Sequence, residues 1–311
     1  MRTAFFKALL EQAELDERIF LVVGDLGFGV VEPFASRYPR RFVNVGVAEQ
    51  NMSGVAAGLA LSGKTVFTYS IGNFPTLRCL EQIRNDICYH RANVKIVTVG
   101  GGFSYGALGM SHHATEDLAI MRALPEMVVV APGDPVEAAR ATAAVVAHPG
   151  PVYLRLGRAG EPTVHQGPIE FSLGKAVTVR SGSDLTLIST GAMLPVAVEV
   201  AGELSKRVRV LSMHTIKPLD VDAVLRAARE TGAIFTLEEH SITGGLGGAV
   251  AEVLAESGDL RVPFKRIGLP PIFSSHVGTQ EYLRARYGMG VADIVKTIRA
   301  ALRREASDSY R

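Results

Sequence analysis

Cysteine is scarce in this chain, and its scarcity narrows the chemistry that the sequence can support. Only two of the 311 residues are cysteines, Cys79 and Cys88, and neither belongs to a Cys-x-x-Cys pair or a Cys/His cluster. A disulfide framework and a structural zinc site both need cysteines in numbers and spacings that this chain lacks. The sequence therefore indicates a reducing compartment, and we expect a cytoplasmic protein.

Long apolar runs and blocks of like charge are also missing. No stretch approaches the roughly 18 apolar residues of a transmembrane helix. The N-terminal segment is interrupted by Lys7 and Glu11, unlike a secretory signal peptide. The net charge is +2, and no cluster of Lys and Arg indicates a nucleic-acid surface. We therefore expect no membrane insertion and no nucleic-acid partner.

What the sequence does contain is a regular alternation of short apolar strands with helical patterns. In the first half, the runs rich in β-branched residues predict strands at Ile19–Val23, Phe42–Val45, Thr65–Tyr69, Val94–Val99, Met127–Ala131 and Val152–Leu156. The segments between them, among them Asn51–Leu61, Leu77–His90 and Pro135–Ala147, have helical periodicity. This alternation is typical of an α/β fold, a mostly parallel sheet with helices on both faces.

A stretch rich in glycine and proline, from about Gly157 to Ser183, divides the chain. Beyond it the alternation resumes with strands expected at Leu185–Thr190, Val208–Met213, Ile234–Glu238 and Phe264–Leu269. We expect two α/β domains, residues 1–160 and 184–311, joined by a linker at 161–183. Because ligands of open parallel sheets bind at the carboxyl ends of the strands, the loops after Val45, Tyr69 and Val99 are the places to look for chemistry.

The first of these loops leads to a carboxylate in unusual surroundings. Glu49 lies in NVGVAEQNMSGVAAGLA, Asn44 to Ala60, where nearly all other residues are small or apolar. In the first turn of a helix, Glu49 could simply favour the positive end of the helix dipole. The small residues would also allow another surface to approach closely, and a carboxylate shielded there could share a proton with a ligand nitrogen. The segment alone leaves both interpretations open.

The second loop, Tyr69 to Arg78, combines aromatic and cationic side chains. Tyr69 and Phe74 could be core aromatics, or could stack on a flat heterocycle at the end of the strand. Arg78 could hold an anion. Arg155 and Arg158, at the end of the last strand of the first domain, allow two interpretations, a solvated pair or the capture of an anion.

The third loop, Val99 to His113, has five glycines and ends in two adjacent histidines. No Lys-Ser/Thr follows the glycines, so a P-loop is rejected. His112 or His113 could move a proton near neutral pH, or both could be structural. Adjacent histidines lack the spacing of helical metal ligands, and we expect no metal site.

In the second half, TGGLGGAVAEVL follows a predicted strand and opens a helix, as a dinucleotide fingerprint does. Its spacing is not Gly-x-Gly-x-x-Gly, and a single match of this kind is weak evidence. A nicotinamide-dependent oxidoreductase therefore remains a minor alternative.

Four segments taken together resemble the C-terminal half of the transketolase family. They are NVGVAEQNMSGVAAGLALSGK, YSIGNFPTLRCLEQIRND, GALGMSHHATEDLAIMRALPEMVVVAPGD and LRLGRAG. The resemblance covers essentially the whole chain and is nearest to split transketolases, whose halves are separate chains. The related deoxyxylulose phosphate synthases share the Gly-x-Ala-Glu-Gln stretch. The resemblance implies the pyrimidine-binding domain of a thiamine diphosphate enzyme, followed by the small transketolase C-terminal domain.

The resemblance also implies roles toward the cofactor. Glu49 would face the N1′ nitrogen of the aminopyrimidine and share a proton with it, as a catalytic and cofactor-binding residue. Phe74 would stack on the pyrimidine ring. Asp25, in VVGDLG, lies where the family often has an acidic residue near the cofactor.

Other matches concern the substrate. His112 corresponds to the family's histidine that approaches the reacting oxygens of the substrate. Tyr69, Arg78 and Arg158 match positions that in relatives line the substrate channel or bind its phosphate. Leu108 replaces an acidic residue of relatives, and Gly100 lies about where full-length transketolases have a phosphate-binding histidine. The substrate is therefore left open.

The pyrophosphate-binding half of the family is missing from this chain, which has no Gly-Asp-Gly…Asn motif. The resemblance implies a separate N-terminal-half subunit that carries this motif and holds Mg²⁺ or Ca²⁺, since a diphosphate needs a metal with oxygen ligands. This chain should be inactive without that partner. The family habit suggests a homodimer core in an α2β2 assembly.

The expected function is thus that of a thiamine diphosphate-dependent transketolase subunit, which transfers a two-carbon ketol group between ketose and aldose (phosphate) substrates. Within the same superfamily, a reaction like that of deoxyxylulose phosphate synthase or of a 2-oxo acid dehydrogenase β subunit is the alternative. Outside it, the alternative is a non-catalytic homodimer that binds a metabolite.

Overall fold

The first sheet has seven strands in the order β10-β5-β6-β4-β3-β1-β2, and every pair is parallel except β10 with β5. The computed structural model describes residues 1–258 and 261–308. The strands are β1 Ile19–Val23, β2 Phe42–Asn44, β3 Thr65–Ile71, β4 Val94–Val99, β5 Val128–Val130, β6 Val152–Leu156 and β10 Thr215–Lys217. All residues of β4 and β6 are buried, as expected of central parallel strands covered on both faces.

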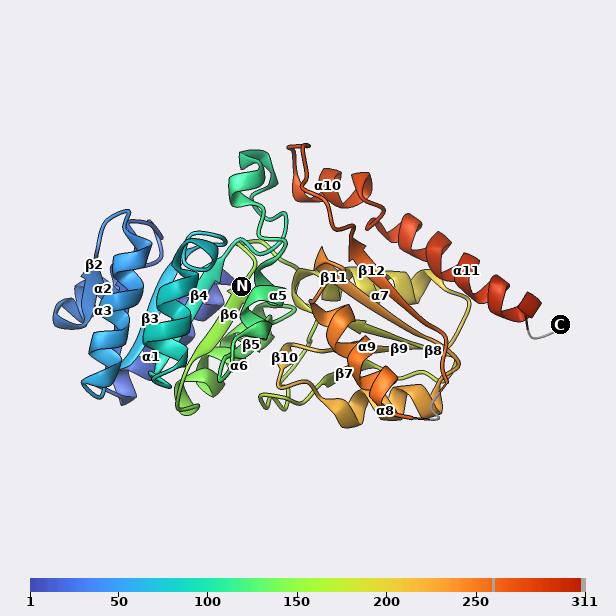
Figure 1. The fold of residues 1–311 in the computed structure, drawn as a ribbon, viewed down its shortest axis with the longest axis horizontal. Coiled ribbons are helices and arrows are strands. Elements are labelled where there is room, and N and C mark those ends of the chain that lie inside the picture. The colour runs from blue at the N-terminus through green and yellow to red at the C-terminus, as the bar shows by residue number, and fades with distance from the viewer. Residues whose placement is uncertain (259–260, 309–311) are drawn as a thin grey trace.

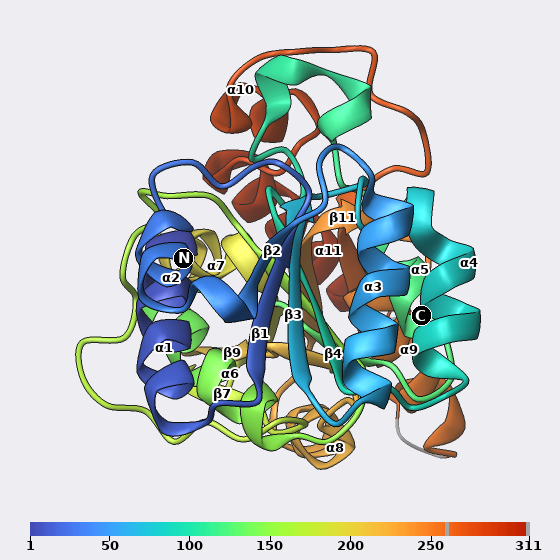
Figure 2. The same ribbon diagram turned by 90° about the vertical axis from the view of Figure 1, so that its left-hand side faces the viewer.

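Helices cover both faces of this sheet (Figure 2). They are α1 Arg2–Leu15, α2 Glu32–Arg37, α3 Glu49–Leu61, α4 Leu80–Gln82 continued by a π-helical turn at Ile83–Cys88, α5 Asp117–Ala123 and α6 Pro135–Ala147. In Figure 2, α1 and α2 lie on one side of the sheet, and α3 and α4 lie on the other. The two apolar faces of the sheet are thereby removed from water, which supplies most of the driving force for folding this half.

The second sheet has five strands in the order β12-β11-β8-β9-β7, with only β7 antiparallel to its neighbour. Its strands are β7 Val177–Arg180, β8 Leu185–Ser189, β9 Val208–Ser212, β11 Ile234–Ser241 and β12 Phe264–Leu269. Its helices are α7 Leu194–Glu203, α8 Val221–Glu230, α9 Leu246–Glu256, α10 Gln280–Arg286 and α11 Val291–Asp308. The two α/β units lie side by side (Figure 1). The expected fold class, two mostly parallel sheets covered by helices, is confirmed.

Two short strands depart from the sequence-based expectation. β7 forms at residues 177–180, within the segment that we expected to be a linker. β10, which follows β9 in the chain, pairs with β5 and so belongs to the first sheet. Both are short antiparallel edge strands, and neither has the apolar run that identifies a central strand in the sequence. The second half of the chain therefore contributes an edge to the sheet of the first half.

The glycines of TGGLGG serve α9 rather than a nucleotide. Glu238, buried in β11, accepts hydrogen bonds from the N–H groups of Leu246 (2.7 Å) and Gly247 (2.8 Å), at the start of α9. A Cβ on Gly245 would lie 2.1 Å from Glu238 Oε2. The helix N-terminus that would bind a pyrophosphate is thus filled by the protein's own carboxylate, and the nicotinamide interpretation is wrong.

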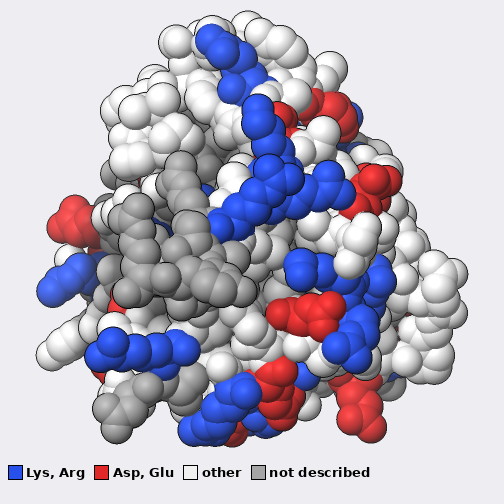
Figure 3. Space-filling model, turned by 90° about the vertical axis from the view of Figure 1, so that its right-hand side faces the viewer, with Lys and Arg blue, Asp and Glu red and all other residues white. Residues whose placement is uncertain are grey.

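In the part of the chain that the structure describes, no helix combines the length and apolar character that a membrane span requires. On the end of the molecule drawn in Figure 3, Lys and Arg side chains lie among Asp and Glu side chains over much of the surface.

The contact between Glu238 and α9 leads to a prediction about stability. Gly245→Ala should lower the free energy of unfolding by about 2 kcal/mol or more, because its methyl group has no space beside Glu238. Gly248→Ala is the matched control in the same helix. There the nearest atom to a new Cβ is Arg122 Nη1 at 3.9 Å, and the better helix propensity should raise stability by up to ~1 kcal/mol. Urea denaturation of both variants checks this, and equal effects would contradict it.

Candidate active site

The loops that follow β1, β3 and β4 come together at one edge of the first sheet, because these neighbouring strands are parallel. The loop after β1 begins at Gly24, the loop after β3 at Gly72, and the loop after β4 at Gly100. The loop at residues 106–112 rises above the sheets beside α10 in both views (Figures 1 and 2). This edge gathers most of the residues that the sequence singled out.

Glu49 is the first residue of α3, yet its side chain does not cap the helix. It is 1% exposed, and its carboxylate bonds to two side chains, Ser70 Oγ at 3.3 Å and Arg78 Nη1 at 2.7 Å. A Cβ on Gly24 would lie 3.3 Å from Glu49 Cγ, so the end of β1 closes over it. Between the two interpretations left open by the sequence, burial at the carboxyl ends of β1 and β3 favours a shielded carboxylate over a solvated helix-end charge.

Three further predicted residues, Arg78, Phe74 and His112, follow this carboxylate in a series of contacts. The guanidinium carbon of Arg78 lies 4.8 Å from the ring centroid of Phe74, a cation–π contact, while Nη1 pairs with Glu49. The ring of Phe74 meets the imidazole of His112 edge to face, with centroids 5.1 Å apart. Glu49, Arg78, Phe74 and His112 therefore form a continuous chain of contacts.

An open cleft of about 310 Å³ lies over this chain of contacts. Both domains line it, through Asn73, Phe74, Leu77, Arg78, Met110, Ser111, His113, Thr115, Glu116, Phe273 and Ser274. Phe273 and Ser274 precede α10, and their presence could not be expected from the motifs. Arg78 lines the cleft and contacts Glu49, whereas Glu49 lies behind it.

The two histidines have different environments. His112 is partly exposed, and its Nδ1 lies 3.0 Å from Ser111 Oγ. Partial burial, and to a lesser extent the nearby His113, lower the pKa of His112, so the neutral imidazole prevails at neutral pH. A neutral imidazole can accept a proton from a hydroxyl group or, in its N–H tautomer, donate a hydrogen bond to an oxygen.

His113 is the residue of this pair that sequence reasoning left without a role. It is 3% exposed, its Nε2 lies 3.0 Å from the carbonyl oxygen of Gly106, and its ring meets Phe103 edge to face. Because a carbonyl only accepts, Nε2 carries the proton. His113 thus anchors the loop from inside, while it also lines the cleft. Its adjacency to His112 was the only signal in the sequence.

Two predicted residues, Tyr69 and Arg158, lie elsewhere. Tyr69 is fully buried against Phe5 and Phe6 of α1, with ring centroids 6.4 and 4.9 Å away. It packs the core and does not line the cleft, so its substrate-binding assignment does not fit its position. Arg158 is exposed, donates to the carbonyl oxygen of Ser104 at 3.3 Å, and does not line the cleft either.

Asp25 is exposed at the end of β1, next to the Gly24 that borders Glu49. Its backbone has a positive φ of 53°, and its Oδ1 accepts a hydrogen bond of 3.0 Å from Asn44 Nδ2. Asn44 Oδ1 in turn accepts from the N–H groups of Asp25 and Gly46. This small network orders the loop beside Glu49, and Asp25 stays a candidate for the cofactor side of the site.

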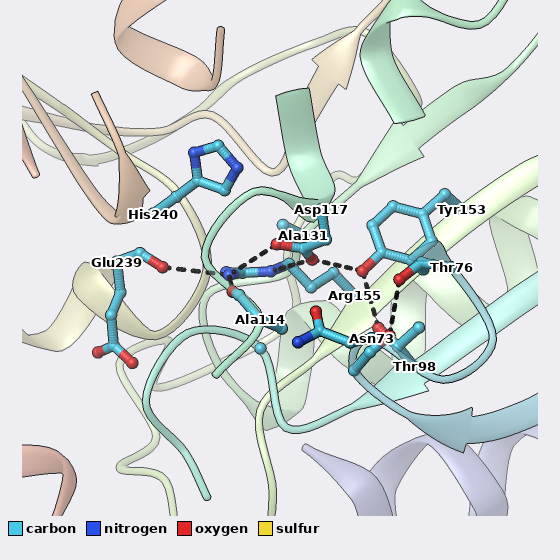
Figure 4. Close-up of polar contacts among 12 residues, drawn as sticks. Asn73, Thr76, Thr98, Ala114, Asp117, Ala131, Tyr153, Arg155, Glu239 and His240 are labelled. Atoms are coloured by element: carbon cyan, nitrogen blue, oxygen red, sulfur yellow. Dashed lines mark hydrogen bonds and ion pairs between the residues drawn. The ribbon is translucent and has the colours of Figure 1, made fainter. Parts of the chain in front are cut away.

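Arg155 is neither a solvated arginine nor an anion-binding one. It is 5% exposed, and its Nε donates to Asp117 Oδ2 at 2.7 Å (Figure 4). The hydroxyl of Tyr153 donates to the same carboxylate oxygen of Asp117 at 2.5 Å. Arg155 and Tyr153 therefore both bind Asp117 inside the protein. The two interpretations that the sequence suggested for Arg155, a solvated side chain and an anion-binding one, were wrong.

Comparisons with known proteins identify the two domains of this chain. Residues 1–161 match the transketolase pyrimidine-binding domain, and residues 174–294 match the transketolase C-terminal domain. The chain is 42% identical over 301 residues to one subunit of the apulose-4-phosphate transketolase of Phocaeicola vulgatus, with 95% of each chain covered. It is 40% identical over 300 residues to a 6-deoxy-6-sulfo-D-fructose transketolase subunit of Clostridium sp. strain MSTE9, covering 95% of this chain and 92% of the relative.

A solved structure described as a split gene transketolase, an inactive β4 tetramer, superposes with a TM-score of 0.87 at 39% identity, covering 97% of both chains. The resemblance that the four sequence segments indicated is thereby confirmed. The chain belongs to the transketolase family and corresponds to the C-terminal half of a transketolase-type transferase, its pyrimidine-binding and C-terminal domains.

Proposed function

We propose that this chain provides the proton-handling half of a two-chain, thiamine diphosphate-dependent transketolase. The observation that carries the proposal is the position of Glu49, a buried carboxylate at the carboxyl edge of the sheet. Arg78 contacts both this carboxylate and the aromatic ring of Phe74, so the carboxylate and the ring lie near each other. A buried carboxylate beside an aromatic ring fits an aminopyrimidine, which offers a ring nitrogen to protonate and a flat face to stack. When bound, thiamine diphosphate supplies the carbon nucleophile and electron sink for cleaving a ketose.

The side chains of the site then have defined roles. Glu49 holds a proton for the N1′ nitrogen of the pyrimidine, and Ser70 orients the carboxylate through its hydrogen bond. Phe74 gives the ring its stacking surface. His112, neutral at neutral pH, exchanges a proton with a hydroxyl or carbonyl oxygen of the substrate. Asp25 stands beside Glu49 on the cofactor side.

The metal and the diphosphate require a second chain. Among the residues that the structure describes, no group of three or more His, Cys, Asp or Glu side chains could hold a metal ion. Mg²⁺ or Ca²⁺ needs oxygen ligands to bind a diphosphate, and we assign them to an N-terminal-half subunit with a Gly-Asp-Gly…Asn motif. Exposed apolar residues at and near the cleft, Met110 (58%), Leu108 (56%) and Phe273 (76%), support docking of such a partner at this edge.

The assembly that fits these requirements is an α2β2 heterotetramer with a homodimer of this chain at its core. The relative whose structure is described as a β4 tetramer is also described as inactive, which supports the need for a partner. The two cysteines, Cys79 and Cys88, are free and buried, and such thiols are typical of the cytoplasm, where we place the protein.

For the substrate we propose a ketose or aldose with a terminal anionic group. The names of two relatives specify a sugar phosphate and a sulfonated sugar. Among the described residues that line the cleft, Arg78 is the one Lys or Arg. A Cβ at Gly100 would lie 2.3 Å from the ring of Tyr105, so no side chain at that position can bind the anion. The acceptor contacts therefore differ from those of full-length transketolases at this point.

Replacing the carboxylate tests the catalytic proposal. In the pair reconstituted with its partner chain, Glu49→Gln should lower the rate of ketol transfer by about 100-fold or more, since general acid–base groups contribute factors of this size. Glu252→Gln, which removes an exposed carboxylate of α9, is the control and should keep wild-type activity. The donors to compare are ketoses and 2-oxo acids. Activity of Glu49→Gln within a few-fold of wild type would refute the assigned role, and a preference for pyruvate would favour a deoxyxylulose phosphate synthase-like reaction.

A second prediction concerns the contribution of the Arg78–Glu49 ion pair to the free energy of unfolding. Arg78→Met should lower the free energy of unfolding by about 1–3 kcal/mol, because it leaves the buried Glu49 carboxylate with Ser70 as its remaining partner. Adding Glu49→Gln should restore most of this loss, since a neutral amide is less costly to bury. Arg91→Met is the matched control. Its ion pair with Glu126 is exposed on both sides and should contribute less than ~1 kcal/mol. Urea denaturation of the wild type, Arg78→Met, Glu49→Gln and the double variant measures the coupling between the two side chains. Additive effects of the two substitutions on the free energy of unfolding would contradict the prediction.

A further inference from the structure

The glycine-rich loop that carries both histidines is closed where Gly102 pairs with Ala114, and we call this pair the neck of the loop. Gly102 and Ala114 exchange two backbone hydrogen bonds, of 2.8 and 3.1 Å, and form an isolated antiparallel bridge. The residues between them therefore leave and return to the sheet at one point. Because His112 lies only two residues before Ala114, its position depends on where this neck is fixed.

A carboxylate of the C-terminal domain holds one side of the neck. Glu239, near the end of β11, is 2% exposed, and its Oε1 accepts the N–H of Phe103 at 2.6 Å. From α10, Gln280 Nε2 donates to both oxygens at 2.8 and 3.1 Å, and Arg284 forms an ion pair with the same carboxylate. The side chain thus joins the loop to α10 in a buried, charge-assisted network.

The backbone of the same residue reaches the other side of the neck. Arg155 donates from one guanidinium nitrogen, Nη2, to the carbonyl oxygens of Glu239 (3.1 Å) and Ala114 (2.7 Å), as Figure 4 shows. Asp117 pairs with this guanidinium at 2.7 Å and keeps it in place. Both ends of the loop are therefore tied to one residue of β11, Glu239.

The sequence of the loop is adapted to this contact. Gly102 has a positive φ of 64°, and a Cβ there would lie 2.3 Å from Glu239 Oε1. Any other residue would be strained in its backbone and would push the carboxylate away. Beyond the neck, the N–H of Gly278 donates to the carbonyl oxygen of Gly106 at 3.3 Å, so the loop also rests on the segment before α10.

We propose that Glu239 is a positioning residue, through which the C-terminal domain sets the place of His112 beside Phe74 at the cleft. Glu239 does not line the cleft and acts only through the loop. The proposal rests on the ketol transfer described above, in which His112 contacts the substrate. It gives the C-terminal domain an indirect part in the reaction, through the position of the loop.

Glu239→Gln in the full-length chain, alone and with its partner, is the first test. Glutamine keeps the size of the side chain, but its amide nitrogen must face donors from Phe103, Gln280 and Arg284. In the chain alone, hydrogen exchange of the amides from 103 to 113 should become about tenfold faster, with the rest of the chain unchanged. In the reconstituted pair, kcat/KM for ketol transfer should fall tenfold or more, roughly the effect of misplacing a reacting group, while thiamine diphosphate affinity changes by less than about twofold.

Two further variants separate positioning from a general loss of structure. Gly102→Ala approaches the same contact from the loop side and should reproduce both effects. In a chain that already carries His112→Ala, Glu239→Gln should change kcat/KM by less than about twofold, since both changes act on one group. Glu252→Gln, which removes the carboxylate of another ion pair between the domains, should leave the exchange of residues 103–113 as in wild type.

The proposal is overturned if exchange in the loop stays within twofold of wild type, if the effects of Glu239→Gln and His112→Ala on kcat/KM multiply, or if Glu239→Gln exposes the whole chain to exchange. The exchange experiment needs no activity. If the wild-type pair shows no ketol transfer while Glu239→Gln still loosens the loop, the proposed ketol transfer is refuted and the contact of Glu239 with the loop is not.

Discussion

A carboxylate that is removed from water must be paired, and the functional edge of this chain is organised around three that are buried. Asp117 has the buried guanidinium of Arg155 and the hydroxyl of Tyr153. Glu239 has a backbone N–H, an amide and a guanidinium. Within the described part of the chain, Glu49 is paired with the hydroxyl of Ser70 at 3.3 Å and with Arg78, whose side chain is 46% exposed. Two of the three are therefore bound fully within the protein, and Glu49 is the one whose partner can move.

The origin of their partners explains which of these three acidic residues could be recognised from the sequence. Glu49 stands out in the sequence because its neighbours are small and apolar, and local composition is visible without a structure. Asp117 and Glu239 are surrounded by donors from distant segments, Arg155 and Arg284 among them. Such partners are set by topology, because they meet only when parallel strands bring their ends to one edge. The interpretation of Arg155 as a surface or anion-binding residue failed for this reason.

The strands show the same limit. β1, β4 and β6 have the bounds that their apolar runs predict, since a strand covered on both faces must be mostly apolar. β12 also has its predicted bounds, although it is an edge strand in which Lys265 and Arg266 are exposed. β7 and β10 are short, lie at sheet edges, and have no such run. Tyr69 was ambiguous from sequence because an aromatic at the end of a strand can face either side. Its place in the core was decided by Phe5 and Phe6 of α1, which cover that face of the sheet.

The glycines of the loop after β4 are then explained without a phosphate. Gly100 leaves space for Tyr105, Gly102 for Glu239, and Gly106 for Leu283 before the chain turns toward His112. Gly102 and Gly106 allow side chains of the C-terminal domain to reach the loop backbone, and Gly100 allows Tyr105 of the same loop to pack against it. The run of glycines is therefore a surface for contacts within the protein. In the function that we propose, the proton-handling groups and the metal reside on different chains. A loop fixed from the C-terminal domain lets this chain keep His112 in place before the partner arrives, so less order has to be created when the two halves meet.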